Sequence, residues 1–176
     1  ALPLWGQSQN GLKLGSDTAK VGTIADVPLT LSTTDQVQGL VAAFDWPAAA
    51  GTGLDLVSGP ALAGADTVVR RVGANFMVLG VVMDSDPNDA GSPEIIGPGS
   101  DLLVATASIR CAPDPNPSVP GDELTAPIDF RDGLYAAVGV SPVLDNIVVV
   151  GGLSIGATEG LTLTSGVLRC VEGFNR

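Results

Sequence analysis

The sequence contains no histidine, and its charge is one-sided: eight Lys and Arg stand against nineteen Asp and Glu, a formal net charge of −11. Histidine is the commonest general base and metal ligand, so its absence excludes Ser-His-Asp triads, Cys-His pairs and His-bound zinc. Only carboxylate chemistry remains, and no motif marks two of the acids as a catalytic pair. The acidic excess would repel a phosphate backbone. We therefore expect neither enzymatic activity nor a nucleic-acid partner.

Long apolar runs and aromatic side chains are also scarce. No apolar stretch approaches the roughly 20 residues that a membrane-spanning helix needs, so we expect no membrane span. Aromatic residues make up 4% of the chain. A carbohydrate platform usually needs a row of exposed rings, and Trp5, Trp46 and Tyr135 supply few. Because Trp46 alternates with Phe44, we expect it in the core, and carbohydrate binding is disfavoured.

What the chain does contain is 45% hydrophobic residues, punctuated by 23 Gly and 13 Pro. Such punctuation interrupts helices, while short segments of alternating apolar and polar residues between turns predict strands. About nine strands in a chain of this length predict an all-β fold, an antiparallel jelly-roll β-sandwich forming a single domain over residues 1–176. The predicted segments are 27–31, 39–46, 54–57, 67–72, 75–83, 102–111, 128–130, 146–150, 161–163 and 167–171.

The alternation also predicts which side chains face the core. Val27, Leu29 and Leu31 share one face of their strand, and Pro28 indicates an edge strand because proline cannot donate to a ladder. Residues 75–83 are apolar almost throughout, which is typical of a strand covered on both faces. Two further sets are predicted to share a face, namely Leu40, Ala42, Phe44 and Trp46, and Leu103, Ala105, Ala107, Ile109 and Cys111.

The two cysteines, Cys111 and Cys170, each end a predicted strand. An isolated pair separated by a long loop favours a disulfide over a metal site. Two unpaired thiols remain the alternative, because spacing in the sequence does not show that the Cα atoms are close enough to be bridged. A disulfide would indicate an oxidising compartment, and Ala1 is a plausible first residue after removal of a signal peptide. We therefore expect a secreted or cell-surface protein.

One loop offers alternating oxygen ligands of the kind that calcium prefers. The candidate ligands are Asp84, Asp86, Asn88, Asp89 and Glu94. An EF-hand would require Gly where Asp89 stands and Glu where Ile95 stands, so this is not an EF-hand. The alternative is a solvated turn in which Asp and Asn side chains accept hydrogen bonds from their own backbone. Calcium is the one cofactor that the sequence suggests, and none is required.

The order of several segments along the chain resembles that of the cohesin family, the receptor modules of cellulosome-type assemblies, and of cohesin-like domains in other bacterial surface proteins. The segments are Lys20–Gly22, Val27–Leu31, Val37–Leu40, Phe44–Pro47, Pro60–Asp66, Met83–Asp86 and Gly99–Ala105. The sequence departs from the family in the order of residues at the Phe44–Pro47 corner and in the longer, proline-rich region 113–152.

The resemblance implies a nine-stranded jelly-roll sandwich whose best-known activity is calcium-dependent capture of dockerin modules. A dockerin or another surface protein would then dock on a sheet face, and residues 173–176 resemble the start of a linker that often precedes a dockerin. Two alternatives remain. The chain could be a structural subunit of an extracellular fibre or layer, with residues 1–15 as an arm on the next copy, or a carbohydrate-binding module.

Overall fold

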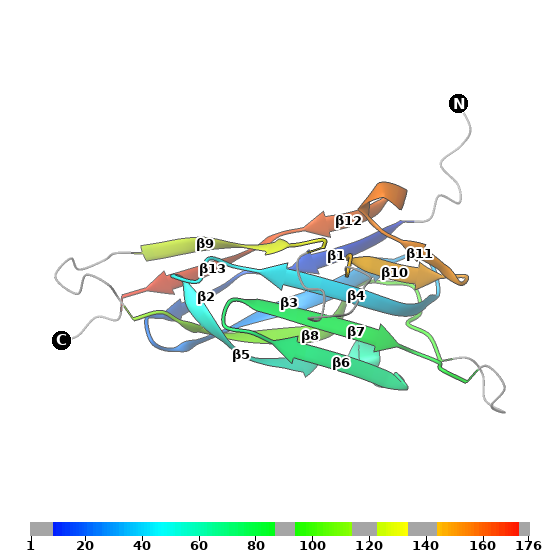
Figure 1. The fold of residues 1–176 in the computed structure, drawn as a ribbon, viewed down its shortest axis with the longest axis horizontal. Helices are drawn as coiled ribbons and strands as arrows, with labels where there is room; N and C mark the ends of the chain where they lie inside the picture. Colours follow the sequence, from blue (N-terminus) through cyan, green and yellow to red (C-terminus); the bar gives the residue numbers. More distant parts are fainter. Residues whose placement is uncertain (1–8, 87–93, 114–122, 134–143, 173–176) are drawn as a thin grey trace.

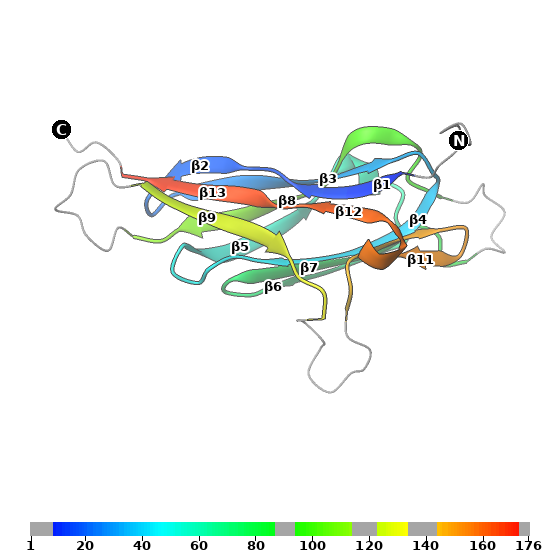
Figure 2. The ribbon, with the colours of Figure 1, turned by 90° about the horizontal axis from the view of Figure 1, so that it is seen from above.

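The computed structural model describes residues 9–86, 94–113, 123–133 and 144–172. Two β-sheets pack face to face, with β3 and β8 in one layer and β4, β7 and β6 in the other (Figures 1 and 2). The five-stranded sheet has the order β12 (Leu161–Thr164), β1 (Asn10–Leu14), β3 (Ile24–Thr33), β8 (Gly99–Cys111) and β5 (Gly51–Ser58).

The second sheet has eight strands. Its main path is β11 (Leu153–Ile155), β10 (Ile147–Val150), β4 (Val37–Asp45), β9 (Glu123–Phe130), β13 (Gly166–Val171) and β2 (Asp17–Lys20). On the other side of β4 lie β7 (Phe76–Val82) and then β6 (Thr67–Val72). Two 3-10 turns, Pro60–Leu62 and Ala157–Glu159, complete the regular structure of the described residues. The all-β sandwich predicted from the sequence is confirmed.

The core lies between the sheets and follows the predicted alternation on β3 and β4. Val27, Leu29 and Leu31 are fully buried. The inward set on β4 and just beyond it is also buried, and comprises Leu40, Ala42, Phe44 and Trp46. The indole Nε1 of Trp46 donates to the carbonyl of Gly51 at 3.0 Å, so its one polar atom is satisfied. The core position expected for Trp46 is confirmed.

On β8 the predicted alternation is correct from Ala105 to Cys111 but wrong for Leu103. The register between β3 and β8 skips Val104, which marks a bulge. A bulge adds one residue and inverts the side-chain phase beyond it. Consequently Val104 is buried and Leu102 packs against the core, whereas Leu103 is excluded from it.

Pro28 does not mark an edge strand, because β3 lies between β1 and β8. The carbonyl of Pro28 accepts a hydrogen bond from the N–H of Gly15 at 2.8 Å. In an extended strand the nitrogen and carbonyl of one residue face the same neighbour, so the missing donor also faces Gly15. There β1 has already ended at Leu14, and the ladder needs no N–H from the proline.

The sheets are mixed, which corrects the expectation of a wholly antiparallel sandwich. β1 pairs in parallel with β12, and β2 pairs in parallel with β13. Residues 10–14 therefore occupy the domain's own sheet, where Leu12 and Leu14 are buried. This contradicts the hypothesis that all of residues 1–15 form an arm for the next copy; residues 1–8, including Trp5, lie outside the described residues.

The number of strands was also underestimated: the described residues contain thirteen. The sequence did not predict the short strands β1, β2 and β11. Several observed strands extend beyond the segments predicted for them, as β9 does beyond residues 128–130. One reason for the underestimate is that the first strand changes sheets after Leu14, which divides it into β1 and β2. β1 continues into β2 and β12 into β13, and both changes occur where Gly15 and Gly166 touch. A Cβ on Gly166 would overlap the carbonyl oxygen of Gly15.

A disulfide joins the two sheets. Cys111 ends β8 in the five-stranded sheet and Cys170 lies on β13 in the other sheet. Their Cα atoms are 5.7 Å apart, and both residues are buried. The structure thus contains the bridge favoured by the sequence, and it closes a loop with a sequence separation of 59 residues.

Candidate functional site

The outer face of the five-stranded sheet is polar, as expected for a sheet with one solvated side. Its outward side chains alternate with the buried residues of β1, β3, β8 and β12. Most are polar, namely Lys13, Asp26, Thr30, Ser32, Thr106, Ser108, Arg110, Thr162 and Thr164, while Ile24 on β3 and Val57 on β5 are exposed apolar side chains of the same sheet. A hollow of about 560 Å³ lies over Gly11 on this face and is bordered mainly by hydroxyl-bearing side chains. None of the described residues that line it is aromatic.

The outer face of the second sheet is apolar across β6, β7, β4 and β10. We call five of its outward apolar side chains the apolar face: Val41, Val69, Val82, Ile147 and Val149. Each alternates with a neighbour that packs into the core. Val69 is 61% exposed and Val82 is 44% exposed, while the other three are half-buried. Contiguous exposed apolar side chains on an otherwise acidic protein indicate an interaction surface.

The strand register places these side chains in rows. Val69 pairs with Gly80, Gly80 with Val41, and Val41 with Ile147. The next row runs through Val82, Gly39 and Val149. The space above Gly80 is open, because a Cβ there would have its nearest contact, the Cβ of Val69, at 4.0 Å. The glycines keep the centre of the apolar face flat.

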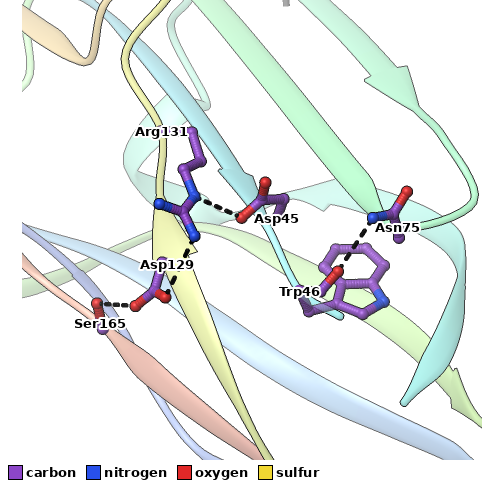
Figure 3. A network of polar contacts seen from close by, with 6 residues as sticks. All are labelled: Asp45, Trp46, Asn75, Asp129, Arg131 and Ser165. Atoms are coloured by element: carbon purple, nitrogen blue, oxygen red, sulfur yellow. Dashed lines mark hydrogen bonds and ion pairs between the residues drawn. The ribbon is translucent and has the colours of Figure 1, made fainter. Parts of the chain in front are cut away.

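A cluster of charged side chains lies at the ends of β4 and β9, on the same side of β4 as Val41. Figure 3 shows Arg131 between Asp45 and Asp129. Arg131 Nε donates to Asp45 Oδ1 at 3.0 Å, and the guanidinium also lies 3.8 Å from Asp129 Oδ2. Ser165 Oγ donates to Asp129 Oδ1 at 2.6 Å. Arg131 is half-exposed, so each ion pair contributes little to stability. An apolar centre with a charged rim is typical of protein interfaces.

Asn146 holds β10 in place against β4. Between the part of β4 that pairs with β9 and the part that pairs with β10, the ladder has a gap at Ala43. Asn146 Oδ1 fills it by accepting the N–H of Ala43 at 2.6 Å, while Arg131 N–H donates to the carbonyl of Ala43. The side-chain and backbone N–H groups of Asn146 both donate to Asp132 Oδ1. This fully buried amide positions the strand that carries Ile147 and Val149.

The run of apolar residues at 75–83 is the part of the sequence that indicates the apolar face. Residues 75–83 were predicted to be covered on both faces, and Met77, Val78, Leu79 and Val81 are indeed buried. Val82, however, is 44% exposed on the outer side, so the prediction is wrong at that end. Apolar residues on both faces of β4 and β7 indicate either a covered sheet or an interface, and alternation alone does not separate these cases.

The predicted calcium ligands are only partly described. Asp84 Oδ1 accepts the N–H of Asp86 at 3.1 Å, which is the self-capping turn given as the alternative. Glu94 lies beside Gly64, and Asn88 and Asp89 fall outside the described residues. Within the part of the chain that is described, no three His, Cys, Asp or Glu side chains are grouped to hold a metal ion. The calcium site stays a prediction.

Two carboxylates have perturbed acidities. The backbone N–H and the hydroxyl of Ser85 donate to Asp66 Oδ2 and lower the pKa of Asp66. Hydrogen bonds from the hydroxyl of Thr158 and the N–H of Gly156 lower the pKa of Glu159. Both carboxylates are exposed and both are stabilised in the ionised form, so neither has the raised pKa of a general acid. Glu159 borders a hollow of about 240 Å³ near Asp132 and Asn146.

Comparison with solved structures finds proteins of similar fold, whereas comparison with family models and curated proteins finds none. No family model matches the chain, and no curated protein matches it. None of the helices among the described residues is long and apolar enough to cross a membrane.

Solved structures similar to this one are cohesins. A cohesin of OlpC from Clostridium thermocellum, solved with a dockerin, has a TM-score of 0.68 at 14% identity, covering 94% of this chain and 95% of that chain. The third ScaC cohesin of Acetivibrio cellulolyticus, solved with the ScaB dockerin, has a TM-score of 0.67 at 14% identity, covering 93% and 99%. A non-cellulosomal cohesin from Archaeoglobus fulgidus has a TM-score of 0.62 at 15% identity, covering 93% and 92%. The chain therefore has the cohesin fold over nearly its whole length.

Proposed function

We propose that this domain is a non-catalytic docking module that binds a dockerin-type protein partner on the apolar face. The observation that carries the proposal is the contrast between the two outer faces. One sheet presents mainly hydroxyls and charges to solvent, with Ile24 and Val57 as its exposed apolar exceptions, whereas the other presents valine and isoleucine across four adjacent strands. Burying those side chains against a partner would recover about 25 cal/mol for each Å² of apolar area removed from water.

The class of partner is supported by the solved cohesins, two of which were seen bound to dockerins. The absence of histidine and the lowered pKa values of Asp66 and Glu159 support a module without chemistry of its own. The buried disulfide supports an extracellular or cell-surface location, since such bridges persist in oxidising compartments.

Two matched lysine substitutions test the apolar face. Gly80→Lys places a charged side chain in the open space at its centre, where nothing obstructs the new Cβ. Gly11→Lys does the same on the polar face, where the new Cβ would meet only Thr162, at 3.5 Å or more. Both glycines lie on strands, so the two changes perturb the fold similarly.

Binding would be measured by calorimetry against a panel of purified dockerin modules, including those of Clostridium thermocellum and Acetivibrio cellulolyticus. We expect at least one dockerin to bind the unmodified domain and Gly11→Lys equally, and Gly80→Lys at least about tenfold more weakly, because a buried unpaired charge is costly. Equal binding by Gly80→Lys would show that the partner docks elsewhere. No binding by any dockerin would count against the class of partner.

Calcium binding by the loop at 84–94 is a separate proposal, supported by the spacing of its oxygen ligands. Calorimetry on the isolated domain with calcium tests it. Heat of binding and a rise in the unfolding temperature are expected at millimolar calcium, and the absence of both would remove the site.

A further inference from the structure

The strand β6 is hydrogen-bonded on one side only. It pairs with β7 from Thr67–Val82 to Val72–Met77, and in the described structure no other strand joins it. Its six residues include neither glycine nor proline. A strand of this kind presents a row of N–H and C=O groups that another extended chain can pair with.

The register shows which backbone groups face the open side. The N–H of Gly73 donates to the carbonyl of Phe76 at 2.8 Å, so these two residues form a hydrogen-bonded pair beside the turn. Hydrogen-bonded and non-hydrogen-bonded pairs alternate along an antiparallel ladder. The residues whose backbone groups point away from β7 are therefore Val68, Arg70 and Val72.

The neighbouring edge strand β5 differs from β6, because side chains occupy the hydrogen-bonding groups on its open side. On β5 the carbonyl of Leu56 accepts a hydrogen bond from the guanidinium of Arg70 at 3.3 Å. The N–H of the same leucine donates to Asp55 Oδ1 at 2.8 Å. Side chains thus occupy the midpoint of the β5 edge, as natural proteins do to prevent strand addition. Within the described ranges, no hydrogen bond of this kind reaches the open side of β6.

The charge at this edge is opposite to that of the protein as a whole. Arg70 and Arg71 are two of only eight basic residues in a chain with a net charge of −11. Neither guanidinium covers the edge, since Arg70 reaches β5 and Arg71 lies over the ring of Phe76 at 5.4 Å from its centroid. Val69 and Val72 are exposed beside them. An extended segment bearing carboxylates matches this edge in both hydrogen bonding and charge.

We propose that the open edge of β6 binds an extended acidic segment of a partner polypeptide by strand addition, with the backbone groups of Val68, Arg70 and Val72 as the pairing sites. A second copy of this chain is a poorer occupant. Antiparallel pairing of β6 with itself would bring two Arg70–Arg71 pairs together, and like charges across strands are destabilising.

The test uses the whole domain, labelled with nitrogen-15, and three synthetic hexapeptides. The first alternates Glu with Val, the second alternates Lys with Val, and the third is the Glu peptide with every backbone nitrogen methylated, so that neither of its edges can donate hydrogen bonds. We expect the Glu peptide to shift and protect the amides of Val68, Arg70 and Val72. The Lys peptide should bind about tenfold more weakly, and the methylated peptide should not bind.

Two substitutions in the protein test whether the peptide binds at the β6 edge. Val72→Pro removes one open-edge donor without removing a bond to β7, whereas Val72→Thr keeps the donor and the β-branched shape. Loss of peptide binding in Val72→Pro and retention in Val72→Thr is expected, with Gly11→Lys unaffected because Gly11 lies on β1 in the other sheet. The proposal is overturned if the Glu peptide shifts no β6 amide at millimolar concentration, shifts the apolar face instead, or binds no better than its methylated form. Retention of binding in Val72→Pro would likewise overturn it, and failure of dockerin docking would leave these outcomes unchanged.

Discussion

Removing the disulfide between Cys111 and Cys170 should lower the free energy of unfolding by about 4 kcal/mol. The bridge closes a loop with a sequence separation of 59 residues. In the chain-entropy model, closing a loop of that length lowers the conformational entropy of the unfolded chain by about 14 cal/mol/K. This raises the free energy of the unfolded state by about 4 kcal/mol at 25 °C. For a domain of this size that loss corresponds to a fall of about 8–16 °C in Tm.

The measurement is urea unfolding followed by the fluorescence of the buried Trp46, with oxidised protein compared to protein refolded in reductant. The reduced protein keeps both sulfur atoms, so the difference isolates the cross-link. The double variant Cys111→Ala with Cys170→Ala adds the loss of packing and should be less stable still. The slope m should also rise on reduction, because the uncrosslinked unfolded chain exposes more surface. Coincident unfolding curves for oxidised and reduced protein would refute the reasoning.

Three further changes have expected outcomes. Asn146→Ala leaves the buried N–H of Ala43 without its acceptor and should cost about 1–3 kcal/mol in urea unfolding; an unchanged midpoint would mean that water replaces the amide. Gly166→Ala would overlap the carbonyl of Gly15 and should cost about 1–3 kcal/mol or more, which thermal unfolding would detect as a lower Tm. The pKa of Asp66 is held below its ordinary value of 3.8, so its stabilising contribution is complete above the unfolded pKa and disappears as pH falls through the lower folded pKa. Asp66→Asn should therefore weaken the loss of stability on acidification below about pH 4, and parallel pH profiles for the two proteins would contradict this.

The alternation of small apolar residues was sufficient to predict the sandwich and much of its core. On β3 and β4 each predicted inward residue is buried, because both strands are regular where those residues lie. The bulge at Val104 could not be predicted, since an extra residue in a strand leaves no mark on composition and shows only in the partner's register. The two parallel pairs depend on residues far apart in the sequence, so the alternation within one segment does not predict them.

The candidate site was less predictable than the fold. Val41 alternates with the predicted inward residues Leu40 and Ala42, but the sequence gives no sign that the side of the strand bearing Val41 faces solvent. Only the register of β6, β7, β4 and β10 shows that Val41, Val69 and Ile147 lie in one row. The role of Asn146 is similarly hidden, because the gap that it fills exists only where β9 and β10 share the edge of β4.

The pairing of the first strands with the last has a consequence for how the domain forms during synthesis. β1 and β2 emerge early, yet their parallel partners β12 and β13 are among the last segments made; the hydrogen bond between Ser16 and Val167 spans 151 residues. Contacts of such long range slow folding and leave early strands unsatisfied while the chain is incomplete. The ribosome must therefore finish nearly the entire domain before either sheet can close, and Cys111 cannot form its disulfide until the 59 residues that separate it from Cys170 have been made.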